Sequence, residues 1–196
     1  NEKENIPLLV DSLRNILRDT AWEVIFVDDN SPDGTIGVVR HLALSDPRIR
    51  GILRVGRRGL SSAVMEGILS SSAAFVAVMD GDLQHDETCL PDMISKMQTG
   101  IYDVVVASRH VNGGDSSGLA GIWRHIVSRG GNLVARLTGV PISDPMSGFF
   151  IVRREWFEKI TPDLSGRGFK ILFEALFVAP KPLRIREVPM IFRDRL

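Results

Sequence analysis

The sequence predicts an α/β fold in which a mostly parallel central sheet is covered by helices on both faces. Apolar runs of five or six residues alternate with stretches of helical periodicity, as in parallel strands joined by crossover helices. These runs contain few polar residues, which is expected of strands buried on both faces. With 196 residues, 44% hydrophobic and 24% charged, the chain suits one globular domain.

The first half of the chain repeats a helix and strand pattern. Residues 5–18 place apolar side chains at steps of three and four, which predicts an amphipathic helix. Residues 22–27 form an apolar run that stops at the turn-forming residues 28–34. The same reasoning predicts helices at 35–44, 60–70 and 88–98 and strands at 51–55, 74–79 and 102–107.

The second half is less regular. A Gly/Ser-rich stretch at 110–121 precedes a helical pattern at 122–137. Further strands are predicted at 149–152 and 183–192, with a helix at 169–179 between them. There is no internal repeat and no linker composition, so we assign residues 1–196 to one domain.

Charge and cysteine content exclude several classes of protein. The chain has 24 basic and 24 acidic residues, which argues against a nucleic-acid partner, although residues 1–98 sum to −5 and residues 99–196 to +5. The single cysteine, Cys89, rules out an intrachain disulfide, favours a reducing compartment and is expected in the core. The longest apolar run, residues 73–79, is far shorter than a membrane span.

An acidic motif follows the predicted strand at 74–79. Alternate residues of an extended segment point the same way, so Asp80, Asp82 and Gln84 offer three oxygen ligands to one point. Mg²⁺ or Mn²⁺ is usually held by one or two carboxylates, with phosphates and water completing the shell. On spacing alone the structural alternative is favoured, in which Asp80 caps a turn and Asp82 is solvated.

A second acidic strand end is formed by Asp28 and Asp29. Turn chemistry favours an Asx-turn here, and the alternative is that one carboxylate binds a nucleobase or ribose. The sequence has no G-x-G-x-x-G after a strand, no P-loop and no G-x-S-x-G, so dinucleotide, P-loop and serine-hydrolase functions lose their usual support.

Charged residues cluster at one predicted rim. Asp28, Asp29, Asp80 and Arg109 follow strands, and ligands of open parallel sheets bind outside the carboxyl ends of strands. Two further residues, Arg124 and Ser128, are four positions apart on a predicted helix and can reach one ligand. A solvated helix edge is the favoured alternative for that pair.

Several motifs together carry a family resemblance. The chain resembles the family 2 glycosyltransferases of the dolichol-phosphate mannose synthase type over nearly its whole length. Asn1-Glu2 is similar to the end of a P-T-Y-N-E opening. The other motifs are VDDNSPDGT (27–35), RRGLSSA (57–63), MDGDLQH (79–85), ASRH (107–110), DPMSGFF (144–150), GFKILFE (168–174) and EVPMIFRDR (187–195).

The resemblance implies a GT-A fold and the inverting transfer of mannose from GDP-mannose to a dolichyl or polyprenyl phosphate. It places six residues around the nucleotide-sugar, namely Glu2, Val27, Asp29, Asp80, Gly81 and Asp82. It assigns Mg²⁺ or Mn²⁺ to Asp80, Asp82 and Gln84, and the acceptor phosphate to Arg109, Arg124, Ser128 and Arg193. Asp82 and the four residues of the acceptor site are the expected catalytic residues.

The resemblance also implies a location at the cytoplasmic face of a membrane, peripheral or anchored by segments outside this sequence. We therefore expect a membrane subunit or a C-terminal membrane domain, and an opening strand and C-terminal continuation that this sequence lacks. One departure is Asp86-Glu87, where relatives often have prolines. The alternatives are a UDP-sugar donor of glucose or N-acetylhexosamine, a phospho-accepting signalling domain and a silent scaffold subunit.

Overall fold

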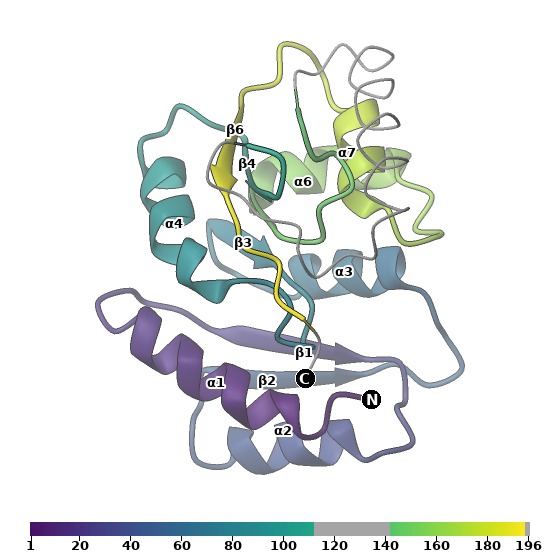
Figure 1. The fold of residues 1–196 in the computed structure, drawn as a ribbon. Helices are drawn as coiled ribbons and strands as arrows, with labels where there is room; N and C mark the ends of the chain where they lie inside the picture. Colours follow the sequence, from purple (N-terminus) through teal and green to yellow (C-terminus); the bar gives the residue numbers. More distant parts are fainter. Residues whose placement is uncertain (112–141, 195–196) are drawn as a thin grey trace.

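The computed structural model describes residues 1–111 and 142–194 and consists of alternating helices and strands (Figure 1). In chain order these are α1 (Asn5–Ile16), β1 (Val24–Asp28), α2 (Thr35–Ala43), β2 (Ile49–Leu53), α3 (Leu60–Leu69), β3 (Phe75–Val78), η1 (Glu87–Cys89), α4 (Leu90–Gln98), β4 (Val104–Ser108), β5 (Phe150–Arg153), α6 (Arg154–Ile160), η2 (Thr161–Asp163), α7 (Ile171–Val178) and β6 (Ile185–Pro189).

The strands form two sheets. β1 and β2 pair in parallel, from Val24 opposite Ile49 to Asp28 opposite Leu53. The second sheet has the order β3-β5-β4-β6, in which β4 and β6 are parallel and β5 is antiparallel to both of its neighbours. The parallel arrangement expected from the sequence therefore holds for two pairs, and β5 runs the other way. Hydrophobic pattern does not encode strand direction, and the long connection before β5 permits either.

Helices cover both faces of the second sheet, as the sequence predicts. Alternate residues of β4 and β5 point to opposite faces, so Val104 and Val106 pack with α6 and α7 while Val105 packs with α1 and α4. The helix residues of the first layer are Phe157, Ile160, Leu172 and Leu176, and those of the second are Leu9, Leu13, Leu90, Met93 and Met97. All of these side chains are buried. This packing fixes the carboxyl end of β4, from which Arg109 follows.

Most predicted elements are observed with small shifts. The strand expected at 51–55 lies at 49–53, the strand expected at 183–192 is confined to 185–189, and α6 was not predicted. Only seven residues long, α6 follows β5 directly, so its helical period covers less than two turns. The predicted helix at 122–137 and most of the stretch at 110–121 lie outside the described residues.

The single cysteine is partly buried. Its Sγ donates a hydrogen bond to the carbonyl oxygen of Pro189 at 3.4 Å, and the side chain packs against the cluster beneath α4. Burial, with the nearby Asp86 and Asp92, raises the pKa of the Cys89 thiol to about 11. The residue is therefore a packing residue and not a reactive thiolate.

A cavity of about 680 Å³ lies between β1 and β3, with α1 and α3 contributing to its walls. In the described part of the chain no strand hydrogen-bonds the two sheets to each other. The lining extends beyond the carboxyl ends of both strands, to Asp29 and Asp80. Over the ranges 1–111 and 142–194, no helix has the length and apolar character needed to span a membrane.

Candidate functional site

The two carboxylates after β1 have separate roles. Asp28 is buried and its Oδ2 accepts the backbone N–H of Ser31 at 3.1 Å, which is the turn role expected of one of them. Asp29 instead accepts the backbone N–H of Gly59 at Oδ2, at 2.8 Å, and its Oδ1 lies 3.2 Å from Nε of Arg54. Asp28 therefore makes the turn contact, whereas Asp29 contacts the segment that follows β2.

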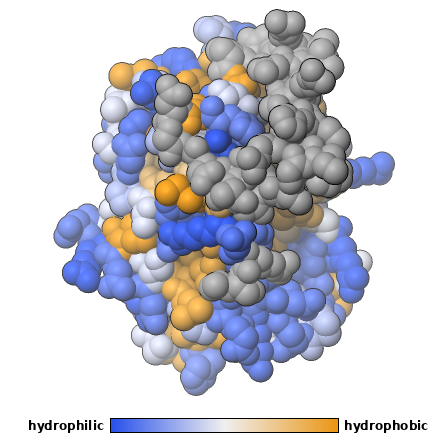
Figure 2. Space-filling view, viewed as in Figure 1, coloured by the Kyte–Doolittle hydropathy of each residue, from blue (hydrophilic) through white to orange (hydrophobic). Residues whose placement is uncertain are grey.

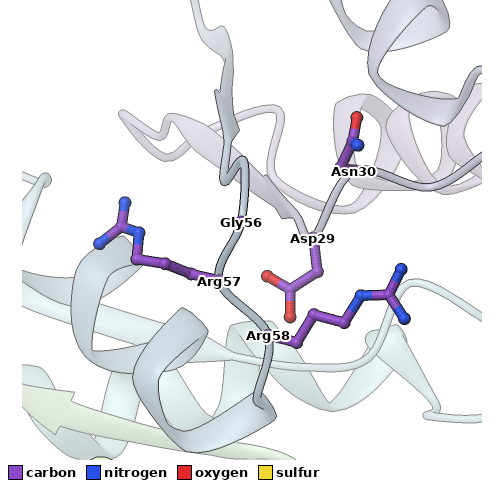
Figure 3. A pocket seen from close by; sticks show the side chains of 5 residues that line it. All are labelled: Asp29, Asn30, Gly56, Arg57 and Arg58. Carbon is purple, nitrogen blue, oxygen red and sulfur yellow. The ribbon is translucent and has the colours of Figure 1, made fainter.

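Asp29 faces a cavity of about 520 Å³. Asn30, Gly56, Arg57 and Arg58 line it as well, and Figure 3 shows the Asp29 carboxylate beside the backbone of the Gly56–Arg58 loop. The Arg57 side chain points away from that carboxylate and pairs with Glu66 at 3.1 Å, and in this view the Arg58 side chain extends from the other side of the loop. One acidic residue and two arginines thus line this cavity.

The acidic motif after β3 concentrates negative charge. Burial, together with the nearby carboxylates of Asp82 and Glu2, raises the pKa of the Asp80 carboxyl to about 6. Asp82 accepts the backbone N–H of Gln84 at 3.1 Å, which closes a turn in which Leu83 has φ of +63°. Residues 80–84 are therefore not the extended segment that the sequence predicts. Crowded carboxylates disfavour their own ionised forms, and a bound cation relieves this repulsion.

His85 supports Asp80 from inside the protein. It is 3% exposed, and its Nδ1 accepts the backbone N–H of Asp80 at 3.1 Å. A neutral ring that accepts at Nδ1 carries its proton on Nε2, which lies 3.9 Å from Oδ2 of Asp80. Burial lowers the pKa of His85 to about 4, and the ring stacks on Phe149. His85 therefore positions the acidic loop as a neutral residue.

Gly148 allows this close packing. A Cβ at residue 148 would lie 3.1 Å from Cε1 of His85 and 3.4 Å from Oδ2 of Asp80. The loop of residues 144–148 thus approaches the acidic motif at a position where only glycine fits without displacing the ring.

Gln84 connects the acidic motif to the chain after β6. Its side-chain amide donates to the carbonyl oxygen of Arg193 at 3.2 Å, and the backbone N–H of Arg193 donates to the carbonyl oxygen of Gln84 at 2.9 Å. The amide nitrogen is therefore engaged by the protein, and the side-chain oxygen is the atom that could bind a metal.

The residues of this motif fit a hard divalent cation. Asp80 and Asp82 would supply two carboxylates and Gln84 one amide oxygen, which is a donor set suited to Mg²⁺ or Mn²⁺. Among the described residues, no group of three His, Cys, Asp or Glu side chains gathers as a complete metal site. A cation at this motif would therefore complete its coordination with water and with the oxygens of a ligand.

Arg109 is fixed by a buried carboxylate. Its Nε and Nη2 donate to the two oxygens of Asp144 at 2.8 and 2.9 Å, and the Asp144 side chain is completely buried. The backbone N–H of Asp144 in turn donates to Glu187 at 3.1 Å. The guanidinium also lies over the ring of Phe192, 5.4 Å from its centroid. The motif containing Asp144 therefore orients an arginine.

Arg193 is held by both carboxylates of the Asp86-Glu87 pair that departs from the family pattern. Its Nη2 donates to Asp86 and its Nη1 to Glu87, each at 2.7 Å. Glu87 is buried and also accepts the hydroxyl of Ser12 at 2.6 Å. The positive charge of Arg193 is thus offset where it lies, next to the acidic motif.

The structure brings together most of the residues expected around the nucleotide-sugar. Glu2, Val27, Asp29, Asp80 and Gly81 all line the 680 Å³ cavity. Arg109 and Arg193 lie next to the acidic motif. The Arg109 guanidinium lies over the ring of Phe192, and the carbonyl oxygen of Arg193 accepts the side-chain amide of Gln84. Figure 2 shows strongly hydrophilic residues across the middle of one face, with hydrophobic surface above and below them. Arg124 and Ser128 lie outside the described residues.

One residue of this site was missed from the sequence. Arg54 is 1% exposed and contacts Asp29, yet it belongs to no motif that the sequence analysis used. The sequence signal that could have revealed Arg54 is its place directly after an apolar strand, because a charge buried there requires a partner.

The chain is similar to proteins of known type over most of its length. The family model described as Glycosyl transferase family 2 matches residues 1–161. A dolichol-phosphate mannosyltransferase of Pyrococcus furiosus is 37% identical over 199 residues, which cover 100% of this chain and 54% of that protein. The enzyme of the same name from Saccharomyces cerevisiae is 35% identical over 178 residues, covering 88% of this chain and 66% of the relative.

Solved structures support the fold. Glucosyl-3-phosphoglycerate synthase from Mycobacterium tuberculosis, in complex with Mn²⁺, UDP and phosphoglyceric acid, superimposes with a TM-score of 0.71 at 19% identity. The match covers 100% of this chain and 68% of that one. The expected GT-A fold is thereby confirmed. The chain itself spans between about half and two thirds of the length of the curated relatives it matches.

Proposed function

This chain belongs to glycosyl transferase family 2, and from this premise we propose that it transfers a sugar from a nucleotide-sugar to a polyprenyl phosphate. The proposed donor is GDP-mannose, and the proposed acceptor is dolichyl or polyprenyl phosphate, as the names of the curated relatives suggest. The resemblance to this family that the sequence motifs indicate is confirmed by the family model and by these relatives.

The observation that carries the proposal is the set of carboxylates beyond the carboxyl ends of β1 and β3. Those of Glu2, Asp29 and Asp80 come from three separate segments and line that end of the cavity, whereas the rest of its lining runs along the strands and is largely apolar. A nucleoside diphosphate offers groups that match: N–H donors on the base, hydroxyls on the ribose, and phosphates that bind through a cation. We assign Asp29 to the nucleoside and Asp80 to the diphosphate.

The proposed metal site is Asp80, Asp82 and Gln84. A divalent cation bound there would stabilise the negative charge that develops on the departing nucleoside diphosphate. Burial is the main cause of the raised pKa of Asp80, and the nearby carboxylates of Asp82 and Glu2, which raise it as well, support this assignment.

The arginines of the site complement the phosphates. Arg109 is held by Asp144 in a fixed orientation, and we assign it with Arg193, Arg124 and Ser128 to the acceptor phosphate and the leaving diphosphate. A phosphate monoester has a second pKa of about 6, so it is already an anionic nucleophile near neutral pH. Its oxygen would bond to the anomeric carbon as the bond to the diphosphate breaks on the opposite face, which inverts the configuration. This route requires no general base.

The lipid acceptor places the proposed reaction at the cytoplasmic face of a membrane. Attachment would be peripheral, or would come from a membrane subunit or from membrane segments elsewhere in the polypeptide. The signalling-domain alternative loses its support because Asp28 is bonded within a turn and the chain belongs to a transferase family.

Transfer of radiolabelled sugar to dolichyl phosphate in the presence of Mg²⁺ or Mn²⁺ tests the proposal. We expect GDP-mannose to be used and the Asp82→Ala variant to be inactive, whereas Asp92→Ala, which removes an exposed carboxylate paired with Lys96 on α4, should retain activity. Full activity of Asp82→Ala would contradict the metal assignment. Transfer from UDP-glucose but not from GDP-mannose would replace the proposed donor with a UDP-sugar.

A further inference from the structure

Arg54 is the largest fully buried side chain in the described part of the structure, at 1% exposure. It follows the last residue of β2, and its guanidinium contacts three separate segments. Nη2 donates to Oγ of Ser62 at 2.8 Å, Nη1 donates to the carbonyl oxygen of Gly59 at 3.3 Å, and Nε lies 3.2 Å from Oδ1 of Asp29. A buried guanidinium is costly unless it is paired in this way.

Arg54 and Gly59 both contact the Asp29 carboxylate from the protein side. Oδ1 is buried and forms an ion pair with Nε of Arg54 without a hydrogen bond, and Oδ2 accepts the backbone N–H of Gly59. The side chain is still 30% exposed, and it lines both the end of the 680 Å³ cavity and the 520 Å³ cavity of Figure 3.

Arg54 also couples Asp29 to the wall of that cavity. The carbonyl oxygen of Gly59 accepts the hydrogen bond from Nη1 of Arg54. Gly59 has φ of +137°, a conformation that strongly favours glycine. The same residue donates its N–H to Asp29. The carboxylate and the loop of residues 56–59 thus form one unit around the guanidinium.

We infer that Arg54 is a positioning residue for recognition of the nucleobase, because it sets the orientation in which the Asp29 carboxylate accepts N–H groups of the base. This inference rests on the proposed function, in which Asp29 lies at the nucleoside. Arg54 acts through Asp29, and the diphosphate, bound at Asp80, does not depend on it.

Lysine cannot replace this arginine. Arginine presents five N–H donors in a rigid plane, which lets one side chain donate to Ser62 and Gly59 while its Nε forms an ion pair with Asp29, whereas lysine is a single point charge on a flexible stem. Arg54→Lys therefore retains the buried charge and removes the fixed geometry.

Calorimetric titration of the full chain with GDP, UDP and inorganic diphosphate, each with Mn²⁺, tests the inference. We expect Arg54→Lys to weaken binding of the preferred nucleotide by about 10- to 100-fold and to leave diphosphate binding within about twofold of the unmodified protein. The matched control is Arg50→Lys, which changes an exposed arginine of β2 that pairs with Glu23 at 2.9 Å, and it should alter neither titration.

A loss that depends on the base distinguishes positioning from a general structural role. Unchanged nucleotide binding by Arg54→Lys, or equal losses for nucleotide and diphosphate, would overturn the inference. If Arg54→Lys does not fold, Ser62→Ala removes one anchor of the guanidinium and should show the same base-dependent pattern at smaller amplitude. Absence of nucleotide binding by the unmodified protein is a separate result, which would overturn the proposed function and this inference with it.

Discussion

Removing the carboxylate of Asp144 should destabilise the protein strongly. The Asp144 side chain is fully buried and its two oxygens bind Arg109, whose side chain is only 12% exposed. Asp144→Ala leaves that guanidinium in a poorly solvated site without its anion. Breaking one partner of a buried ion pair typically costs about 3–5 kcal/mol. In a domain of this size each kcal/mol lowers the melting temperature by about 2–4 °C, so we expect a decrease of about 6–20 °C.

Thermal and urea unfolding of Asp144→Ala, Arg109→Ala and the double variant measure this coupling. The double variant should be less destabilised than the sum of the two single variants, by about 1–3 kcal/mol. Asp103→Ala is the matched control, because Asp103 also binds an arginine through both oxygens, but its partner Arg184 is 54% exposed. The control should cost about 1 kcal/mol or less. If Asp144→Ala cost no more than this control, the argument from burial would be wrong.

Four further predictions concern the acidic motif and its neighbours. Because the pKa of Asp80 is raised to about 6, Mn²⁺ affinity measured by calorimetry should fall about tenfold per pH unit below that value and level off above it. Because the pKa of Asp80 is raised in the folded state, its protonation stabilises the metal-free fold relative to the unfolded chain. This stabilisation is complete below about pH 4 and is lost as the pH rises through 6. Asp80→Asn should therefore abolish this loss of unfolding free energy. Gly148→Ala should cost about 1–3 kcal/mol and weaken Mn²⁺ binding, because the new Cβ would lie 3.1 Å from the imidazole behind Asp80, whereas Gly37→Ala on α2, with no atom within 4 Å, should not destabilise. Glu87→Gln should lower the KM for the acceptor severalfold by releasing one of the two bonds that engage Arg193, and a higher KM would contradict the proposed role of that arginine.

Local sequence pattern was enough to predict most of the helices and strands, though not α6, because the burial of a strand or of one helix face leaves a record in the order of apolar residues. The apolar runs of β1, β3 and β4 and the stripe of α1 were all readable in this way. The direction of β5 could not be predicted in this way. An antiparallel strand and a parallel strand can carry the same apolar residues, and the long connection before β5 permits either direction.

The site was predictable where its residues are adjacent in the chain, and not where they meet across it. Asp80 and Asp82 form a local motif, whereas Arg54 meets Asp29 from the neighbouring strand and Arg109 meets Asp144 from 35 residues away. A lone arginine in a sequence does not show whether its charge is solvated or paired. Only the packing of the two strand ends shows that the guanidinium of Arg54 is buried.

The pairing of these arginines changes how the neutral net charge of the chain is understood. Three of the arginines at the rim already have carboxylate partners within it, Arg54 with Asp29, Arg109 with Asp144, and Arg193 with Asp86 and Glu87. Over residues 1–111 and 142–194, neither Asp80 nor Asp82 pairs with a lysine or an arginine, and their histidine neighbour is neutral. The acidic motif therefore keeps an excess of negative charge beside arginines that are largely neutralised. A diphosphate approaching this rim would be repelled unless a divalent cation bound with it. Under the proposed function, it is this local excess, and not the acidic and basic halves of the sequence, that makes donor binding depend on a metal.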